Sequence, residues 1–184
     1  MRKRCFWVND DPLYIAYHDN EWGKPVYDDD TLFEFLLLES FQAGLSWITI
    51  LKKRENFREA FDNFNYEKVA NYNEKKVNQL IENKGIIRNK LKVRSAITNA
   101  QLFMEIQQEY GSFSNYIWSF VNGEPIVNQF NSREEVPATT KISDSISKAL
   151  KKRGFKFVGS TIMYAFMQAT GMVNDHTTDC FCYS

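Results

Sequence analysis

The sequence predicts an all-α protein that folds as one compact domain spanning residues 1–184. Apolar residues recur three or four positions apart along nearly the whole chain, which is the spacing of one helix face. Residues that cap helix N-termini precede most of these stretches, and glycines stand where several of them end. No internal repeat, low-complexity linker or charged tail divides the chain, and a length of 184 residues suits a single domain.

The first half of the chain contains several clear helix starts. Residues 31–34, Thr-Leu-Phe-Glu, have the form of a capping box before the apolar run at 33–38, and Gly44 lies where this helix would end. Asn65 and Asn73 can each cap a short helix. Ser46 can cap a helix whose helix-spaced apolar residues are Ile48, Leu51, Phe57 and Phe61.

The second half continues in the same way, with its most polar connection at residues 122–142. A longer helix is predicted after Gly85, with an inner stripe of Leu91, Ala96, Ile97, Ala100 and Phe103. Further helices are predicted from Ser112 or Ser114 through Trp118, from Ser143 to Gly154, and from Ser160 to Gly171. Residues 126–127 could form a short β segment, but no sheet is implied.

The two histidines lie at opposite ends of the chain, and each has a cysteine nearby: Cys5 with His18, and His176 with Cys180. Two thiolates and two imidazoles form the ligand set of a closed tetrahedral zinc site. One such ion would join the N- and C-terminal segments, and with four protein ligands it would be structural rather than catalytic. The alternative is two unrelated pairs in which the cysteines are small buried apolar residues.

Composition and charge narrow the class of protein. No run of 18 apolar residues and no signal-peptide stretch is present, which predicts a cytoplasmic protein with no membrane partner. The net charge is zero, which argues against a strongly basic nucleic-acid binder. Basic residues nevertheless gather at 52–54, at 84–94 and at 148–156, where they include Lys151 and Lys152. These clusters could form one phosphate-facing surface, or each could be an ordinary solvated helix face.

Residues 80–92 predict two amphipathic helices that meet at a turn containing Gly85 and Ile86. The N-terminus of the second helix would expose backbone N–H groups beside basic side chains. Such an end binds a phosphate because the free N–H groups and the helix dipole both favour negative charge. This pattern resembles a helix-hairpin-helix element, which clamps the DNA backbone without reading its sequence. An ordinary αα-hairpin with a glycine C-cap is the alternative.

Two stretches, Tyr17-His-Asp-Asn-Glu-Trp-Gly23 and Glu39-Ser-Phe-Gln-Ala-Gly-Leu-Ser-Trp47, resemble the 3-methyladenine DNA glycosylase I family of the helix-hairpin-helix superfamily. The resemblance runs the whole length and includes Gly85-Ile-Ile-Arg88, the segment 148–159 and Asn174-Asp-His176. It implies one helix-hairpin-helix glycosylase domain over residues 1–184. Phe6, beside Trp7, departs from the family pattern but lies outside the residues to which roles are assigned.

The resemblance implies a role for each matching position. Glu39 corresponds to the pocket carboxylate, and Tyr17 and Trp47 correspond to the groups that hold the base. The surrounding wall corresponds to Trp7, Tyr14 and Trp22, and the structural Zn²⁺ ligands correspond to Cys5, His18, His176 and Cys180. Contacts with DNA are expected at Gly44 and Leu45, which would enter the base stack, at Gly85, Ile86, Ile87 and Arg88, and at Lys151 and Lys152.

The implied activity is base-excision repair, in which the N-glycosidic bond of 3-methyladenine in double-stranded alkylated DNA is hydrolysed and the free base is released. Adenine methylated at N3 is cationic, so its glycosidic bond is already activated and no strong general acid is needed. No lysine accompanies the pocket motifs, so a monofunctional hydrolase without strand cleavage is expected. The protein is also expected to be a monomer.

Three alternatives remain from the residues alone. The chain could be a non-catalytic module that binds alkylated DNA, or a zinc-stabilised protein-interaction domain. Glu39 could also be a structural carboxylate satisfied by the backbone or by a tyrosine, with Trp22 and Trp47 as core aromatics.

Overall fold

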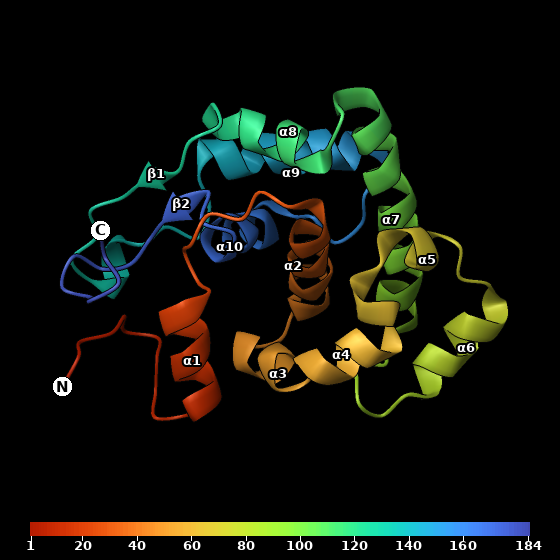
Figure 1. Cartoon of the computed structure of the whole chain (residues 1–184), viewed down its shortest axis with the longest axis horizontal. Helices are drawn as coiled ribbons and strands as arrows, with labels where there is room; N and C mark the ends of the chain where they lie inside the picture. The colour runs from red at the N-terminus through yellow and green to blue at the C-terminus, as the bar shows by residue number, and fades with distance from the viewer.

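Ten α-helices and one very small sheet make up the chain in a computed structural model that describes all 184 residues (Figure 1). The first five helices are α1 (Pro12–Asn20), α2 (Asp29–Gln42), α3 (Trp47–Lys52), α4 (Arg54–Ala60) and α5 (Tyr66–Ala70). The others are α6 (Glu74–Glu82), α7 (Lys90–Tyr110), α8 (Phe113–Trp118), α9 (Lys141–Arg153) and α10 (Ser160–Ala169). Single 3₁₀ turns occupy Asp62–Phe64, Ser119–Val121 and Arg133–Glu135. The predicted helical class is confirmed.

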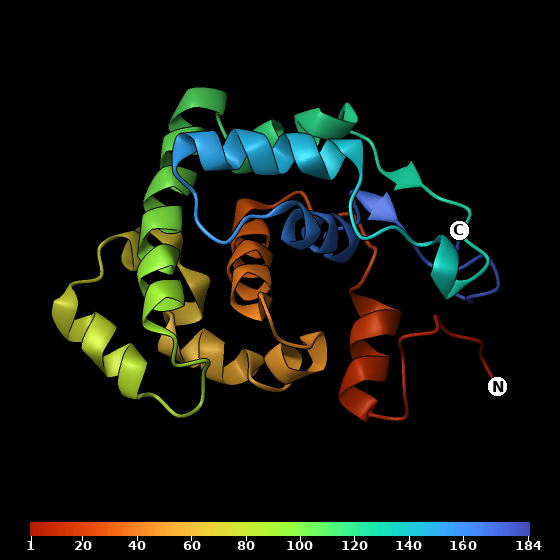
Figure 2. The same ribbon diagram turned by 180° about the vertical axis from the view of Figure 1, so that it is seen from behind.

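Helix α2 lies at the centre of the fold because most of its surface is apolar. Nine consecutive or near-consecutive residues between Leu32 and Phe41 are buried, and a helix that is apolar on nearly all sides must be enclosed by others. Helices α3, α7, α8 and α10 pack around it (Figures 1 and 2). The buried side chains form one continuous core, which accounts for a single domain.

The predicted helix boundaries differ from the structure in three ways. Helix α2 begins at Asp29 with Asp28 as its cap, so Thr31 is not a cap. The single helix expected after Ser46 bends at Lys53 into α3 and α4. Thr140 caps α9 in a capping box with Ser143 at its third position, one turn earlier than predicted. The caps at Asn65, Asn73 and Ser112 are confirmed, because each side chain accepts a hydrogen bond from the first turn of its helix.

Helix α7 begins at Lys90, five residues after Gly85, with Asn89 as its cap. Leu91 therefore lies outside the inner stripe and is 69% exposed, whereas Ala96, Ala100 and Phe103 are buried as predicted. Residues 83–89 form an irregular turn between α6 and α7. Leu91 precedes Ala96 by five residues in this helix, which is about 140° around the axis, so the two side chains lie on different faces.

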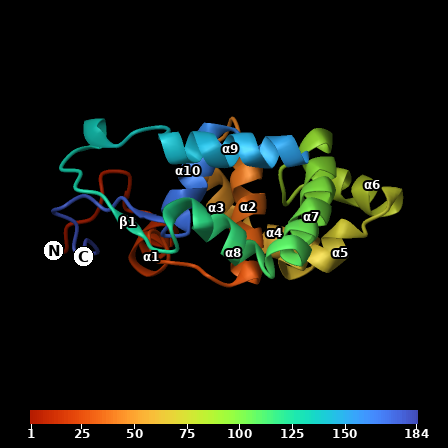
Figure 3. The same ribbon diagram turned by 90° about the horizontal axis from the view of Figure 1, so that it is seen from above.

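Strand β1 (Ile126–Val127) pairs in parallel with β2 (Val173–Asn174), which corrects the expectation of no sheet. This pairing places the C-terminal segment beside the connection at residues 122–142. The chain termini also meet: the N–H of Phe181 donates to the carbonyl of Lys3 at 2.9 Å (Figure 3). The two ends of the sequence are thus brought to one side of the molecule.

Two members of the predicted basic clusters are buried. Lys92 is 7% exposed, and its Nζ donates to the carbonyl oxygens of Phe41 at 2.8 Å and Ala43 at 2.6 Å. Those carbonyls belong to the end of α2, where free acceptors and the helix dipole favour a cation. Arg54 is also buried and pairs with Glu21 and Glu34. Neither residue contributes to a phosphate-facing surface, which corrects the sequence prediction.

Lys92 also joins two segments that were predicted to contact DNA. Its backbone N–H donates to the side chain of Asn89, in the turn before α7, and its ammonium donates to the carbonyl of Ala43, in the loop that follows α2.

No helix of the structure is long and apolar enough to span a lipid bilayer.

Candidate active site

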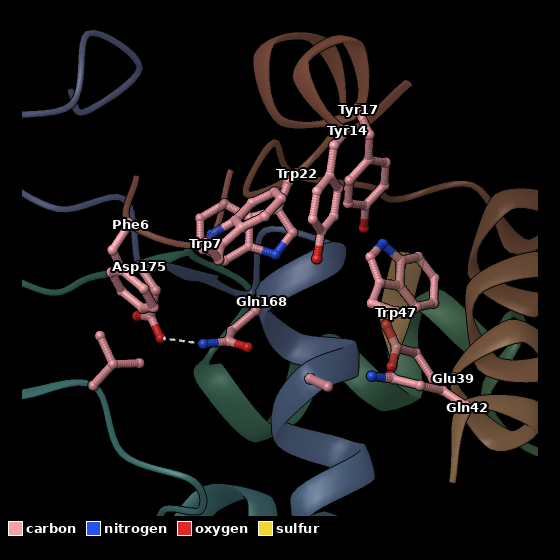
Figure 4. Close-up of a pocket in the computed structure, with 12 residues that line it drawn as sticks. Phe6, Trp7, Tyr14, Tyr17, Trp22, Glu39, Gln42, Trp47, Gln168 and Asp175 are labelled. Carbon is pink, nitrogen blue, oxygen red and sulfur yellow. Dashed lines mark hydrogen bonds between the residues drawn. The ribbon is translucent and has the colours of Figure 1, made fainter. Parts of the chain in front are cut away.

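A cavity of about 240 Å³ opens between the N-terminal segment and helices α1, α2, α3 and α10 (Figure 4). All six residues predicted for the base pocket line it: Trp7, Tyr14, Tyr17, Trp22, Glu39 and Trp47. They come from four separate parts of the chain, so the sequence motifs converge only in the folded protein. Six of the twelve lining residues are aromatic, and a few polar side chains lie among them, as in binding sites for flat ligands.

Glu39 lies in the last turn of α2 and is 3% exposed. Its Oε2 atom has no hydrogen-bond partner in the protein, which contradicts the alternative of a satisfied structural carboxylate. Burial raises the pKa of Glu39 to about 8, because an apolar surrounding disfavours the charged form. At neutral pH this burial favours the protonated form of the carboxyl.

Three further polar atoms in the pocket lack partners: the Tyr17 hydroxyl and the indole nitrogens of Trp7 and Trp47. Burial, followed by the nearby Glu39, raises the pKa of Tyr17 well above its usual value, so its hydroxyl stays protonated. The Tyr17 and Trp47 ring centroids lie 5.5 Å apart. Buried polar groups are rarely left unpaired in native proteins, so four in one cavity indicate a ligand that pairs with them.

Several pocket residues had no role in the sequence analysis. Phe6 lines the cavity, although it was set aside as a departure without consequence. The position of Gln42 in the pocket could have been predicted from the sequence, because it lies three residues after Glu39 and therefore on the same helix face. Asp175 stands inside a quoted motif, next to His176. Gln168 gave no signal, since α10 reaches the pocket only through tertiary packing.

The predicted metal ligands also come together. The side-chain donor atoms of Cys5, His18, His176 and Cys180 all lie within 4.8 Å of one another, and all four residues are buried. The Cys180 Sγ lies 3.4 Å from the His18 Nε2. A tetrahedral zinc-like ion would place neighbouring ligand atoms ~3.3–3.8 Å apart, so the group fits a bound metal.

The surrounding groups prepare both imidazoles for coordination. The Nδ1 of His18 lies 2.8 Å from Asp19, and the Nδ1 of His176 lies 2.9 Å from the Asn174 side-chain oxygen. With Nδ1 engaged in each ring, Nε2 is left to bind the ion, and the Nε2 of His176 has no other partner. Burial raises the pKa of the Cys5 thiol to about 12, so a thiolate there requires a cation.

The metal cluster and the pocket share a wall. The ring of His18 lies 5.3 Å from that of Trp7, and the ring of His176 lies 4.8 Å from that of Trp22. Gly23 lets this wall close, because a Cβ there would lie 2.7 Å from a ring carbon of His176. A metal at this position would therefore support the pocket as well as the chain ends.

The loop predicted to enter the DNA stack begins at the end of α2, one helical turn after Glu39. Gly44 adopts a φ of +82°, which favours glycine, and Leu45 is 40% exposed. Gln42 and Trp47, on either side of this loop, both line the pocket. Leu45 is therefore exposed on a loop whose two flanking helices both contribute to the pocket.

The hairpin residues are only partly free to bind a phosphate. The N–H of Gly85 donates to the Asn83 side chain at 2.8 Å, and that of Ile86 donates to the Asn83 carbonyl. The N–H groups of Ile87 and Arg88 have no acceptor in the protein. Of the four residues predicted to contact DNA here, two therefore keep a free backbone N–H, while Ile86 is buried and anchors the turn.

Lys151 and Lys152 are exposed in the last turn of α9 and form no ion pair. The end of α9 packs against the C-terminal half of α7, where Arg153 pairs with Glu109 at 2.9 Å (Figure 2). Glu109 lies about 28 Å along the helix axis from Lys90 at 1.5 Å per residue. The structure thus does not bring this cluster next to the hairpin turn.

The profile described as "Methyladenine glycosylase" matches residues 7–183. The curated DNA-3-methyladenine glycosylase 1 of Escherichia coli (strain K12) is 54% identical over 181 residues, covering 98% of this chain and 97% of that protein. A crystal structure of 3-methyladenine DNA glycosylase I superposes with a TM-score of 0.96 at 53% identity, covering 99% of this chain and 100% of the other. A Tyr-to-Phe variant of such a protein, in complex with 3-methyladenine, superposes with a TM-score of 0.95 at 39% identity, covering 98% and 97%.

Proposed function

The chain belongs to the methyladenine glycosylase family, and from this premise we propose how its pocket acts in base-excision repair. It releases 3-methyladenine from alkylated DNA by hydrolysing the N-glycosidic bond. The observation that carries this function is the buried, unpartnered carboxyl of Glu39 in an aromatic cavity with three other unpartnered polar atoms. A base-sized ligand with both hydrogen-bond donors and acceptors on its edge would satisfy these atoms.

The pocket selects the methylated base by its charge. Aromatic faces attract a cationic ring by ~0.5–2 kcal/mol each when desolvated, and Tyr17 and Trp47 supply two such faces. Ionised Glu39 adds a Coulombic attraction and accepts a hydrogen bond from an amine. Neutral adenine gains less from each of these contacts, so undamaged DNA is spared. Because the substrate arrives activated, the protein mainly extrudes the nucleotide and stabilises positive charge on the sugar as the bond breaks.

The reaction is a hydrolysis without strand cleavage. A DNA glycosylase that also cleaves the strand needs an amine to form a Schiff base with the sugar. None of the twelve residues that line the pocket is a lysine. Water is therefore the acceptor of the sugar.

The proposed activity is tested by incubating the protein with methylated duplex DNA and measuring free 3-methyladenine by chromatography. We expect stoichiometric release of the base and no strand scission before alkali treatment. A non-catalytic DNA-binding module would retard the duplex without releasing base, and a protein-interaction domain would do neither. Binding without release would therefore reject the enzymatic function.

We propose that the metal is Zn²⁺, held by Cys5, His18, His176 and Cys180. Zinc binds tetrahedrally to this mixture of thiolates and imidazoles, and four protein ligands leave no position for substrate or water. When bound, it supplies structural stabilisation rather than chemistry. The proposal is supported by the hydrogen bonds of the two histidine rings. The Nδ1 of His18 pairs with Asp19 and the Nδ1 of His176 pairs with Asn174, which leaves both Nε2 atoms free to bind the same ion.

We further propose that residues 74–110 act as a helix-hairpin-helix element that holds one DNA phosphate. The free N–H groups of Ile87 and Arg88 and the N-terminal dipole of α7 supply the attraction. Gly44 and Leu45 enter the base stack, and Lys92 ties this loop to the first turn of α7. Lys151 and Lys152 add sequence-independent affinity from the other end of the helix.

Reversal of both charges in Lys151→Glu/Lys152→Glu is expected to weaken binding to undamaged duplexes of different sequence by similar factors. It should also reduce the slope of log affinity against log salt by about 1 for each DNA phosphate that the protein no longer neutralises. Fluorescence-anisotropy titrations across a salt series measure both quantities. An unchanged slope would mean that these lysines are an ordinary solvated helix face.

A further inference from the structure

Gln168, on α10, presents its side-chain amide to the pocket in one fixed direction. Its Nε2 donates to the Asp175 Oδ2 at 3.0 Å, while its Oε1 accepts no hydrogen bond from the protein. Figure 4 shows the amide nitrogen turned toward Asp175 and the oxygen turned away from it, on the side of Glu39 and Gln42. Since a carboxylate can only accept, the amide cannot rotate by half a turn without losing this bond.

Asp175 is itself held in place and is 2% exposed. Its Oδ2 accepts a second hydrogen bond from the Tyr164 hydroxyl, and its Oδ1 accepts one from Asn128 at 2.7 Å. These donors come from α10 and from the segment after β1, so two separate parts of the fold fix the carboxylate. The network leaves Asp175 no freedom to offer Gln168 a different partner.

A free glutamine amide can offer either an N–H or a C=O and therefore accepts either an amino or an oxo group on a ligand. A locked amide offers only its oxygen. Adenine-derived bases carry an exocyclic amine at C6, whereas guanine-derived bases carry an oxo group there. An oxo group facing Oε1 would leave two desolvated acceptors opposed, which is costly in a buried site.

Glu39 cannot make this distinction alone. Burial raises its pKa to about 8, so its protonated form can donate a hydrogen bond to an oxo group as well as accept one when ionised. The exocyclic amine has two hydrogens and can donate to Glu39 and to a second acceptor together. Among the other pocket side chains, an indole N–H can only donate, so it does not favour an amine.

We propose that Gln168 is a specificity-determining residue that accepts a hydrogen bond from the exocyclic amine of the extruded base, and that Asp175 is the positioning residue that fixes its amide. This inference rests on the proposed function, because it assumes that a methylated nucleobase enters the pocket. It predicts a preference for adenine-type over guanine-type lesions, set by a residue outside the sequence motifs.

The test compares free 3-methyladenine with 3-methylhypoxanthine, which has an oxo group in place of the amine on the same ring. Affinities are measured by calorimetric titration of the metal-loaded protein. Gln168→Met keeps the side-chain length but removes the acceptor. We expect it to bind 3-methyladenine about three- to tenfold more weakly, with 3-methylhypoxanthine unchanged or tighter, so that the preference falls. An equal loss for both bases, or an unchanged preference, would overturn the proposal.

Asp175→Asn tests the lock, because an asparagine can donate to Oε1 and allow the amide to rotate. We expect the preference to fall with much of the 3-methyladenine affinity retained. Metal content and the midpoint of thermal unfolding show whether this variant, next to His176, remains folded. Tyr164→Phe removes a donor to Asp175 but leaves the Gln168 bond, so its preference should match the wild type. Failure of the wild type to release 3-methyladenine from DNA would instead reject the proposed function.

Discussion

Replacement of Cys5 by alanine is expected to abolish stoichiometric zinc binding and to lower the free energy of unfolding by roughly 4–5 kcal/mol or more. The ligand set joins residues from both ends of the chain, so loss of the ion removes the strongest connection between them. It also leaves two buried imidazoles and a buried thiol without their partner. Elemental analysis of freshly purified protein and unfolding in urea measure the two effects.

Cys182→Ala is the matched control. Cys182 lies two residues after Cys180 and is half-buried, yet it is not one of the four clustered ligands. Its replacement should leave metal content and stability near those of the wild type. Substoichiometric zinc in the wild type, or equal losses in the two variants, would reject the proposed ligand set.

The shared wall adds a second expectation for Cys5→Ala. Because His18 and His176 pack edge-on against Trp7 and Trp22, loosening of the ligands should also disturb the pocket. Binding of free 3-methyladenine should therefore weaken together with stability. Full retention of base affinity in a metal-free variant would show that the pocket stands independently of the ion.

The sequence predicted best where the information is local or carried by motifs. Asn65, Asn73 and Ser112 are correct caps because a short polar side chain satisfies N–H groups within three residues of itself. The cysteine–histidine spacing and the Tyr17 and Glu39 motifs identified residues that do converge. In each case the type of residue at one position largely determines what it does, whether it caps a helix, binds a metal or lines a pocket.

The errors fall where distant segments compete for the same residue. Lys92 was counted as a surface cation, but the carbonyl groups at the end of α2 attract it into the interior. The error at Thr31 is local instead: it has the pattern of a cap, but Asp28, three residues earlier, takes this role. Gln168 and Asp175 reach the pocket only because α10 and the C-terminal segment fold against α2 and β1. No spacing in the sequence contains that information.

Glu39→Gln is expected to slow excision of 3-methyladenine by about 10- to 150-fold in kcat/KM, which corresponds to one hydrogen bond to a charged group. The variant keeps the shape of the side chain and one acceptor but cannot become an anion. The loss is partial, because the glycosidic bond of the cationic base is already activated and the stacking groups Tyr17 and Trp47 remain. Release of base under single-turnover conditions measures this effect.

The pH dependence separates charge from hydrogen bonding. With its pKa raised to about 8, Glu39 is mostly protonated in the empty pocket at pH 6 and mostly ionised above pH 8. The methylated base in DNA is a cation, so it binds the ionised form better, and kcat/KM for the wild type should rise with pH, reach half its maximum near pH 8 and level off above about pH 9. Glu39→Gln should lose this rise, whereas Glu67→Gln, which changes an exposed carboxylate on α5, should keep it.

If Glu39 acted only through shape, the wild type and Glu39→Gln would share one pH profile and differ little in rate. If it acted as an obligatory general base, activity in Glu39→Gln would fall to the background rate at every pH. The intermediate result, a moderate loss together with loss of the pH dependence, identifies a carboxylate that selects and stabilises positive charge. That role follows from its position: the protein provides Oε2 with no partner, so its charge is balanced only when the cationic base is present.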